Sequence, residues 1–317
     1  MTLPIKLNIS ADSLKEEVKC GFLVSNKLKK IQVIQVDLLN ELLRVCRKHD
    51  IKLTVFAGTM LGAIRHKGFI PWDDDIDVAM TRENFERLQS IAETEFEHPY
   101  FFQTAKRDRR FFCAFARLRN SETTGLLTFN NSADYNNGIF IDIFVMDGIP
   151  DNILKQRIQR AALMIVGRLL NSYYKKDGDY CVDIYNIPLK TKISVKLSKL
   201  IARIFPYSFL IWSYDKLLAM FNKSAKRFGL ITHGSKNMNK YWSTMEELNE
   251  IVELPFENIQ VPVSKNYDTV LCRLYGDYMK FPPVNERGVW HQNIVIWEPE
   301  IPYIQFLQKR NLEQTIK

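Results

Sequence analysis

Four aspartates, Asp73, Asp74, Asp75 and Asp77, lie within five consecutive positions, and they constrain the fold more than any other feature of the sequence. If the segment from Asp75 to Val78 is a β-strand, its side chains alternate between two faces. Asp75 and Asp77 then share one face, about 7 Å apart along the strand, and the apolar neighbours face the core. Carboxylates this close repel one another unless a cation lies among them or some are protonated.

The aspartates are best interpreted as a metal site. Oxygen ligands without His or Cys favour a hard cation, Mg²⁺ or Mn²⁺, over zinc. Magnesium binds few protein carboxylates together with substrate phosphates, which is typical of a phosphoryl-transfer site. The alternative is an acidic surface loop that caps the next helix. The stiff lead-in of Pro71 and Trp72, and the alternation of acids with core residues, favour the metal site.

A further carboxylate, Asp142, stands alone in an apolar segment, Gly138 to Val145, that is expected to be a strand. A carboxylate in such a strand either destabilises the fold or has a function that compensates for its burial. Beside the first pair it would complete a three-carboxylate metal site, although periodicity does not show which strands are neighbours. Asp147 lies just before Gly148. A position in a turn is at least as good an interpretation of this residue as a role in the site.

Small residues follow the short strand expected from Leu53 to Ala57; they are Gly58, Thr59 and Gly62. They are expected to form a turn that brings backbone N–H groups close to phosphate, although a plain strand-to-helix turn would have the same sequence. Basic residues come next, at Arg65, His66 and Lys67. They are expected either to contact a phosphate that the metal holds or to neutralise the aspartates.

The hydrophobic pattern predicts a mixed α/β or α+β core. Apolar residues recur every three or four positions from Leu28 to His49, which is typical of a helix. Thr81 is expected to cap a second helix that runs to about Phe96. Phe111 to Leu118 is expected to be a further strand. The order helix, strand, loop, strand, helix, strand, strand indicates a sheet covered by helices.

Composition changes along the chain predict four segments. They are an N-terminal extension (1–27), a catalytic core (28–152), a basic helical region (153–240) and a C-terminal segment that packs back on the core (241–317). Five scattered cysteines without C-x-x-C spacing indicate a reducing compartment. No apolar signal sequence is found at the N-terminus. We therefore expect a cytoplasmic protein, at most peripheral at the inner face of the membrane.

The net charge of +8 is unevenly distributed, and it excludes an acidic disordered chain. The stretch from Lys155 to Lys240 contains 17 Lys or Arg and 4 acidic residues. The remainder of the chain contains 27 Lys or Arg and 32 acidic residues. The basic stretch is expected to face an anionic membrane or a lipid-linked glycan; the alternative is a set of solvated helix faces. Nucleic acid is not an expected partner, because the stretch carries no recognised binding motif.

Several motifs support one family. The run from Ala57 to Met80 contains Gly58-Thr59, Arg65-His66-Lys67-Gly68-Phe69-Ile70-Pro71-Trp72 and the aspartates. Further motifs are Arg117-Leu118-Arg119-Asn120 with Thr123-Thr124, Phe140-Ile141-Asp142-Ile143-Phe144 with Asp147-Gly148, and Tyr275-Gly276-Asp277-Tyr278. Together they resemble the LicD family of bacterial phosphotransferases, which is similar to the catalytic domains of fukutin and fukutin-related protein. The resemblance covers roughly residues 28–151 and 256–283 and leaves the basic helical stretch unmatched.

The resemblance implies a nucleotidyltransferase-like fold. In that fold Gly58-Thr59 stands for the phosphate-binding turn, Asp75 and Asp77 for the metal-binding pair, and Asp142 for the third acid. Asp73 matches a further acid of the family motif. Thr59 departs from the Ser or Gly that the wider superfamily often has. The loop before Asp75 is also longer than in that superfamily, but the family shares this length.

The implied activity is transfer of an alcohol phosphate from a CDP-alcohol, such as CDP-choline, to a hydroxyl of a glycan, including lipid-linked teichoic acid or lipopolysaccharide precursors. CMP would be released. Mg²⁺ or Mn²⁺ would bridge the diphosphate, Arg65 and Arg117 would clamp phosphate oxygens, and Asp142 is the first candidate for proton acceptor. A choline head group would require aromatic faces. Examples, none of them assigned, are Trp72, Tyr275, Tyr278 and Trp290.

Two alternatives stay open at this point. A true nucleotidyltransferase would have the same fold and metal site but would release pyrophosphate. A non-catalytic glycan- or membrane-associated protein could retain the same fold. The presence of Asp75, Asp77 and Asp142 together argues against the second alternative.

Overall fold

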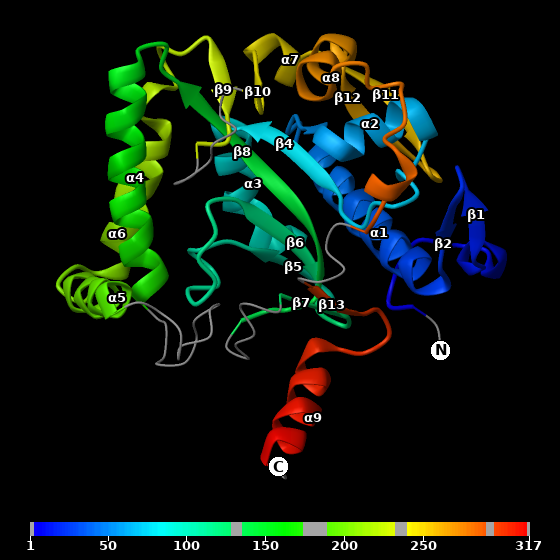
Figure 1. The fold of residues 1–317 in the computed structure, drawn as a ribbon, viewed down its shortest axis with the longest axis horizontal. Helices are drawn as coiled ribbons and strands as arrows, with labels where there is room; N and C mark the ends of the chain where they lie inside the picture. The colour runs from blue at the N-terminus through cyan, green and yellow to red at the C-terminus, as the bar shows by residue number, and fades with distance from the viewer. Residues whose placement is uncertain (1–2, 128–134, 174–188, 232–239, 290–294, 316–317) are drawn as a thin grey trace.

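A curled mixed sheet forms the centre of the computed structural model, which describes residues 3–127, 135–173, 189–231, 240–289 and 295–315. Its longest described strand, β8 (Ile139–Ile149), pairs in parallel with β4 (Asp77–Thr81). The other edge of β8 pairs antiparallel with β6 (Ala116–Asn120) and β9 (Arg227–Gly229). The sheet is extended by β3 (Thr54–Val55), β5 (Tyr100–Gln103) and β10 (Trp242–Ser243) (Figure 1). The predicted mixed α/β fold is confirmed.

Helices α1 (Asn26–Lys48) and α3 (Arg82–Glu95) pack against this sheet (Figure 1). The predicted apolar stripe of α1 is confirmed, since residues such as Ile34 and Leu38 are fully buried. The predicted cap of α3 is also confirmed, because the Thr81 hydroxyl accepts a backbone N–H of the first helical turn. Both helices therefore form where local sequence signals agree with burial.

A layer of helices forms one edge of the molecule, made of α4 (Ile153–Tyr173), α5 (Leu189–Ala202) and α6 (Tyr207–Leu218) (Figure 1). This layer has its own core, which includes Leu163, Leu170, Leu210, Ile211, Tyr214 and Leu218. The helical character predicted for this part of the chain is confirmed in the described residues up to α6. The chain then returns to the central sheet as β9, so the region predicted as 153–240 also contributes a strand to the core.

The C-terminal part contacts the core in two places. The hairpin of β11 (Ile251–Phe256) and β12 (Ile259–Ser264) and helix α8 (Tyr267–Tyr275) pack beside α2 (Ala57–His66). Strand β13 (Val295–Glu298) pairs with β7 (Thr124–Leu127). The other elements are η1 (Ala11–Leu14), β1 (Glu17–Lys19), β2 (Phe22–Val24), η3 (Ala219–Phe221), α7 (Met245–Asn249), η4 (Val284–Glu286) and α9 (Tyr303–Thr315). No helix among the described residues combines the length and the hydropathy needed to span a bilayer.

Several predicted boundaries were wrong. The strand expected from Leu53 to Ala57 is only β3, because Ala57 has a φ of 45° and begins α2. The strand expected from Asp75 begins at Asp77, where pairing with β8 starts. The strand expected from Phe111 begins only at β6, because Phe111 closes a turn by donating its backbone N–H to the Asp108 carbonyl.

Asp147 is not a turn residue. It lies inside β8 and is buried, and its carboxylate accepts hydrogen bonds from Arg82 and Asn222. The Arg82 Nε lies 3.0 Å from Asp147 Oδ1. Gly148, which suggested a turn, instead follows a buried ion pair near the end of the strand.

Candidate active site

Three neighbouring strands bring the principal charged residues to one level of the sheet. In the parallel ladder Asp77 of β4 is opposite Asp142 of β8. In the antiparallel ladder on the other edge of β8, Arg117 of β6 is opposite Asp142. Adjacent strands lie about 4.8 Å apart. The strand register therefore answers the question that periodicity left open, since Asp142 lies beside the first aspartate segment.

The aspartate segment alternates along its whole length. Asp73, Asp75 and Asp77 are partly exposed, whereas Asp74 and the apolar residues between them are buried. The buried carboxylate of Asp74 accepts a hydrogen bond from Trp297 Nε1 at 3.2 Å. Its backbone carbonyl accepts another from the side chain of Gln35, at 2.8 Å. These contacts anchor the segment to the core and leave the other three aspartates facing outward.

Full ionisation of these carboxylates would leave negative charge that the protein does not neutralise. Burial raises the pKa of Asp77 well above its ordinary value, and the charges of Asp75 and Asp142 raise it further, while Arg117 lowers it. Burial likewise raises the pKa of Asp73 to about 7, although a hydrogen bond with the Asp75 side chain acts to lower that pKa. A cation placed among these groups would remove the repulsion.

Arg117 is buried against this site with one group still unused. Its Nε donates to Asp142 Oδ1 at 2.7 Å, and its guanidinium lies 3.8 Å from the centroid of the Phe140 ring. Its Nη1 is buried and has no hydrogen-bond partner. Because an unpaired buried N–H is costly, this atom is suited to an anionic oxygen of a ligand.

The first turn of α2 abuts the acids. The predicted turn at Gly58 and Thr59 is the start of this helix, and Gly62 lies inside it. The Asp77 N–H donates to the buried Thr59 hydroxyl at 2.8 Å, so that side chain fixes the strand. A Cβ on Gly58 would lie 2.9 Å from Asp73 Oδ2. The helix N-terminus, with its free N–H groups, is therefore packed directly against the carboxylates.

Replacing Gly58 by Ala is expected to displace the Asp73 carboxylate. The contact is with the end of a side chain, so we expect a loss of less than about 1 kcal/mol in stability but a clear loss of turnover. Thermal unfolding and steady-state kinetics would measure the two effects. Gly288→Ala is the matched control, because no atom of the described residues lies within 4 Å of the Cβ that this change would add. Equal turnover in both variants would contradict the placement of Asp73 in the site.

The basic residues Arg65, His66 and Lys67 lie at the opposite end of α2, about 10 Å along the helix axis from Gly58. Arg65 Nη1 donates to the Tyr278 carbonyl at 2.7 Å. Burial and the neighbouring Arg65 lower the pKa of His66 to about 4, so it is uncharged at neutral pH and not the predicted cation. Lys67 is exposed in the left-handed conformation that ends the helix.

A cavity of about 430 Å³ lies between α2 and the segment that follows α8. Its lining includes Arg65, Trp72, Tyr275, Tyr278, Lys280 and Phe281. Partial burial raises the pKa of Tyr275, and the charges of Tyr241 and then of Asp73, Asp77 and Asp75 raise it further, so its hydroxyl lies within electrostatic range of the acid cluster. Three of the aromatic residues considered above therefore meet in one cavity. Trp290 lies outside the described residues.

Tyr275 was not assigned a role from the sequence, although the motif Tyr275-Gly276-Asp277-Tyr278 was the available signal. The guanidinium of Arg287 lies 5.1 Å from the Trp72 ring, and Arg65 and Lys280 give the cavity cationic as well as aromatic walls. No sequence feature pointed to Arg287. Both residues enter the site only because the C-terminal segment folds back onto α2.

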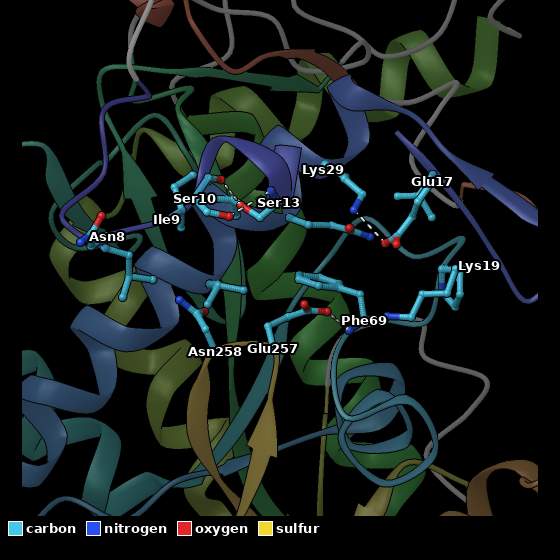
Figure 2. Close-up of a pocket in the computed structure, with 16 residues that line it drawn as sticks. Asn8, Ile9, Ser10, Ser13, Glu17, Lys19, Lys29, Phe69, Glu257 and Asn258 are labelled. Carbon is cyan, nitrogen blue, oxygen red and sulfur yellow. Dashed lines mark hydrogen bonds and ion pairs between the residues drawn. The ribbon is translucent and has the colours of Figure 1, made fainter. Parts of the chain in front are cut away.

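A second cavity, of about 340 Å³, lies between the N-terminal segment, α1 and the β11–β12 turn (Figure 2). Phe69 and Pro71 line it, whereas the alternating Ile70 and Trp72 line the first cavity. None of the predicted site residues lines the second cavity. Two of its charged side chains, Lys29 and Glu17, pair with each other at 2.8 Å, and Glu257 accepts a hydrogen bond from the Phe69 N–H.

Within the described ranges, no three His, Cys, Asp or Glu side chains are already arranged to hold a metal ion. The donor chemistry nevertheless fits a hard cation. The carboxylates of Asp75, Asp77 and Asp142 are close enough to perturb one another, and Asp77 has no neutralising partner as near as the one that Arg117 gives Asp142. The assignment of these residues as metal ligands stays a prediction.

Comparison with known proteins agrees with this geometry. The nucleotidyltransferase domain described for LicD, FKTN and FKRP matches residues 50–160, which include the aspartate segment, Arg117 and Asp142. Residues 50–160 therefore form a domain of the LicD/FKTN/FKRP type. The family resemblance that the motifs predicted is thus confirmed for this part of the chain, and most of the α4–α6 layer lies beyond it.

Individual relatives extend the match. The chain is 28% identical over 275 residues to the lipopolysaccharide cholinephosphotransferase LicD of Haemophilus influenzae, covering 83% of this chain and 96% of that protein. It is 29% identical over 141 residues to an uncharacterized protein of Rickettsia prowazekii, covering 44% of this chain and 48% of that protein. The similarity to the Haemophilus protein thus extends well beyond the catalytic domain.

Proposed function

We propose that this protein transfers an alcohol phosphate, with phosphocholine as the first candidate, from a CDP-alcohol to a hydroxyl of a cell-surface glycan or its lipid-linked precursor. The observation that carries the proposal is the pairing of Asp77 and Asp142 on adjacent strands beside the N-terminus of α2. The similarity to a lipopolysaccharide cholinephosphotransferase supports the choice of donor and acceptor.

In the proposed site, Asp75, Asp77 and Asp142 would hold Mg²⁺ or Mn²⁺, with Asp73 as a further ligand. When bound, the metal supplies positive charge that offsets the charge on the diphosphate and on the departing CMP. The excess negative charge around Asp77 supports this assignment.

The remaining residues would position the donor. Arg117 Nη1 would donate to a phosphate oxygen, while the Nε of the same side chain stays bound to Asp142. Backbone N–H groups of the first turn of α2, at Gly58 and Thr59, would contact another oxygen. The acceptor hydroxyl would lose its proton to a carboxylate, with Asp142 the first candidate. A bond then forms between the acceptor oxygen and the alcohol-bearing phosphorus, and the P–O bond to CMP breaks with its electron pair leaving on CMP.

The cavity that Trp72 and Tyr275 line matches a zwitterionic head group. Trp72, Tyr275 and Phe281 present aromatic rings, which favour a quaternary ammonium. Arg65 and Lys280 provide positive charge for the adjoining phosphate. Phosphocholine carries both groups, so it suits this mixed lining better than a neutral alcohol phosphate does.

The direct test is incubation of the purified protein with Mg²⁺, a glycan acceptor and a panel of CDP-alcohols, with assay of released CMP. CDP-choline is expected to give the highest rate. Pyrophosphate release from a nucleoside triphosphate, without CMP from any CDP-alcohol, would instead support the nucleotidyltransferase alternative that the domain description raises. No CMP from any donor with any acceptor would overturn the proposal.

A further inference from the structure

The helical layer carries an apolar surface that no other part of the described chain covers. Helix α4 buries Leu163 and Leu170 against its neighbours. On its opposite side Leu154, Ile158 and Ile165 are 62%, 60% and 61% exposed. Their spacing of four and seven residues places them in one stripe. A surface helix normally has one apolar side, which packs against the protein. Helix α4 has a second apolar side, and that side is exposed.

The corner between α5 and α6 extends this feature. Leu200 and Ile204 at the end of α5 are 65% and 70% exposed. Phe205, Phe209 and Trp212 follow, and each ring stacks on the next, with centroids 5.8 and 5.9 Å apart. We refer to Phe205, Phe209 and Trp212 as the aromatic ridge. Stacking holds the three rings in one continuous exposed strip (layer in Figure 1).

Cations border the aromatic ridge. The segment from residue 196 to residue 212 contains Lys196, Lys199 and Arg203 and no acidic residue. Lys196, Arg203 and, one turn after the ridge, Lys216 are exposed. Within the part of the chain that the structure describes, no ion pair joins these three side chains to an acid. An exposed apolar strip flanked by unneutralised cations is typical of a surface that lies on an anionic bilayer.

We infer that the aromatic ridge, with Leu200 and Ile204, enters the interfacial region of an anionic membrane, and that Lys196, Arg203 and Lys216 contact its head groups. Charge decides between this partner and a second copy of the chain. Two copies would bring like-charged borders together, whereas anionic lipid complements them. No described helix spans a bilayer, so the contact would be peripheral. The inference does not depend on the proposed chemistry.

Vesicle flotation with the purified full-length chain tests the inference. The protein is expected to float with vesicles of phosphatidylcholine and phosphatidylglycerol, but not with phosphatidylcholine alone, and binding should weaken as salt is raised. Phe209→Ser with Trp212→Ser should weaken binding at least tenfold, because each ring removes apolar area from the interface. Val18→Ser with Leu23→Ser is the matched control, since both residues are exposed on the N-terminal hairpin.

Several outcomes would overturn the inference. They are failure to float with either vesicle, equal binding to both vesicles, and equal binding by the ridge variant and the control variant. A dimer in analytical ultracentrifugation that the ridge variant abolishes, without vesicle binding by the unmodified protein, would assign the ridge to self-association instead. Flotation requires no turnover, so its result is separate from the CDP-alcohol assay.

Discussion

Replacement of Asp77 by Asn is expected to abolish CMP release while making the metal-free protein more stable. A lost metal ligand costs several kcal/mol of transition-state stabilisation, so we expect turnover to fall by about 10³ or more. The free energy of unfolding of the metal-free protein should rise, because the folded state then no longer holds a carboxylate whose charged form its surroundings disfavour. Burial and the charges of Asp75 and Asp142 raise the pKa of that carboxylate.

The same variant should change the response to pH. Because the pKa of Asp77 is higher in the folded than in the unfolded chain, the folded protein binds more protons. The metal-free protein should therefore gain stability as pH falls from neutrality towards about 4, and Asp77→Asn should reduce that gain. Urea unfolding at several pH values measures it, with exposed Asp50→Asn as the control.

Magnesium provides a second readout for Asp77. It should raise the melting temperature of the unmodified protein, because a ligand that binds only the folded state stabilises it. The Asp77→Asn protein should show little of this shift. Unchanged turnover or an unchanged magnesium shift in the variant would exclude the metal role of Asp77.

Replacement of Arg82 by Ala is expected to destabilise the fold by about 3–5 kcal/mol, because it leaves the buried Asp147 carboxylate without its charged partner. The double variant Arg82→Met with Asp147→Leu should lose less, since it leaves no unpaired buried charge. Urea unfolding measures both differences.

The matched control for Arg82 is Arg47→Ala. Arg47 Nη2 lies 3.1 Å from Glu253 Oε2, but both side chains are about half exposed, so the loss should be below about 1 kcal/mol. Equal destabilisation by Arg82→Ala and Arg47→Ala would show that the buried pair makes no special contribution to stability.

Local signals in the sequence predicted the parts of the fold that depend on neighbouring residues. The stripe of α1 and the Thr81 cap of α3 are contained within one helix each, and both are confirmed. The alternation of Asp73, Asp75 and Asp77 is equally local, although the strand begins later than predicted.

Residues whose environment comes from distant segments could not be predicted in the same way. Asp142 and Asp77 are 65 positions apart, and only the register of two strands brings them together. Asp147 was interpreted from Gly148 after it, whereas Arg82 and Asn222 decide its role. His66 was predicted to be a cation. Its burial, which lowers its pKa, could not be predicted, because it comes in part from Phe281, a residue about 200 positions away that stacks on its ring.

The hydrogen bond from Trp297 to Asp74 joins residues 223 positions apart. During synthesis, the aspartate segment leaves the ribosome long before the strand that carries Trp297 is made. The buried carboxylate of Asp74 then has no indole to bond to, and it acquires that partner only when β13 pairs with β7. A nascent chain that has not yet reached Trp297 therefore lacks this anchor of the acidic segment.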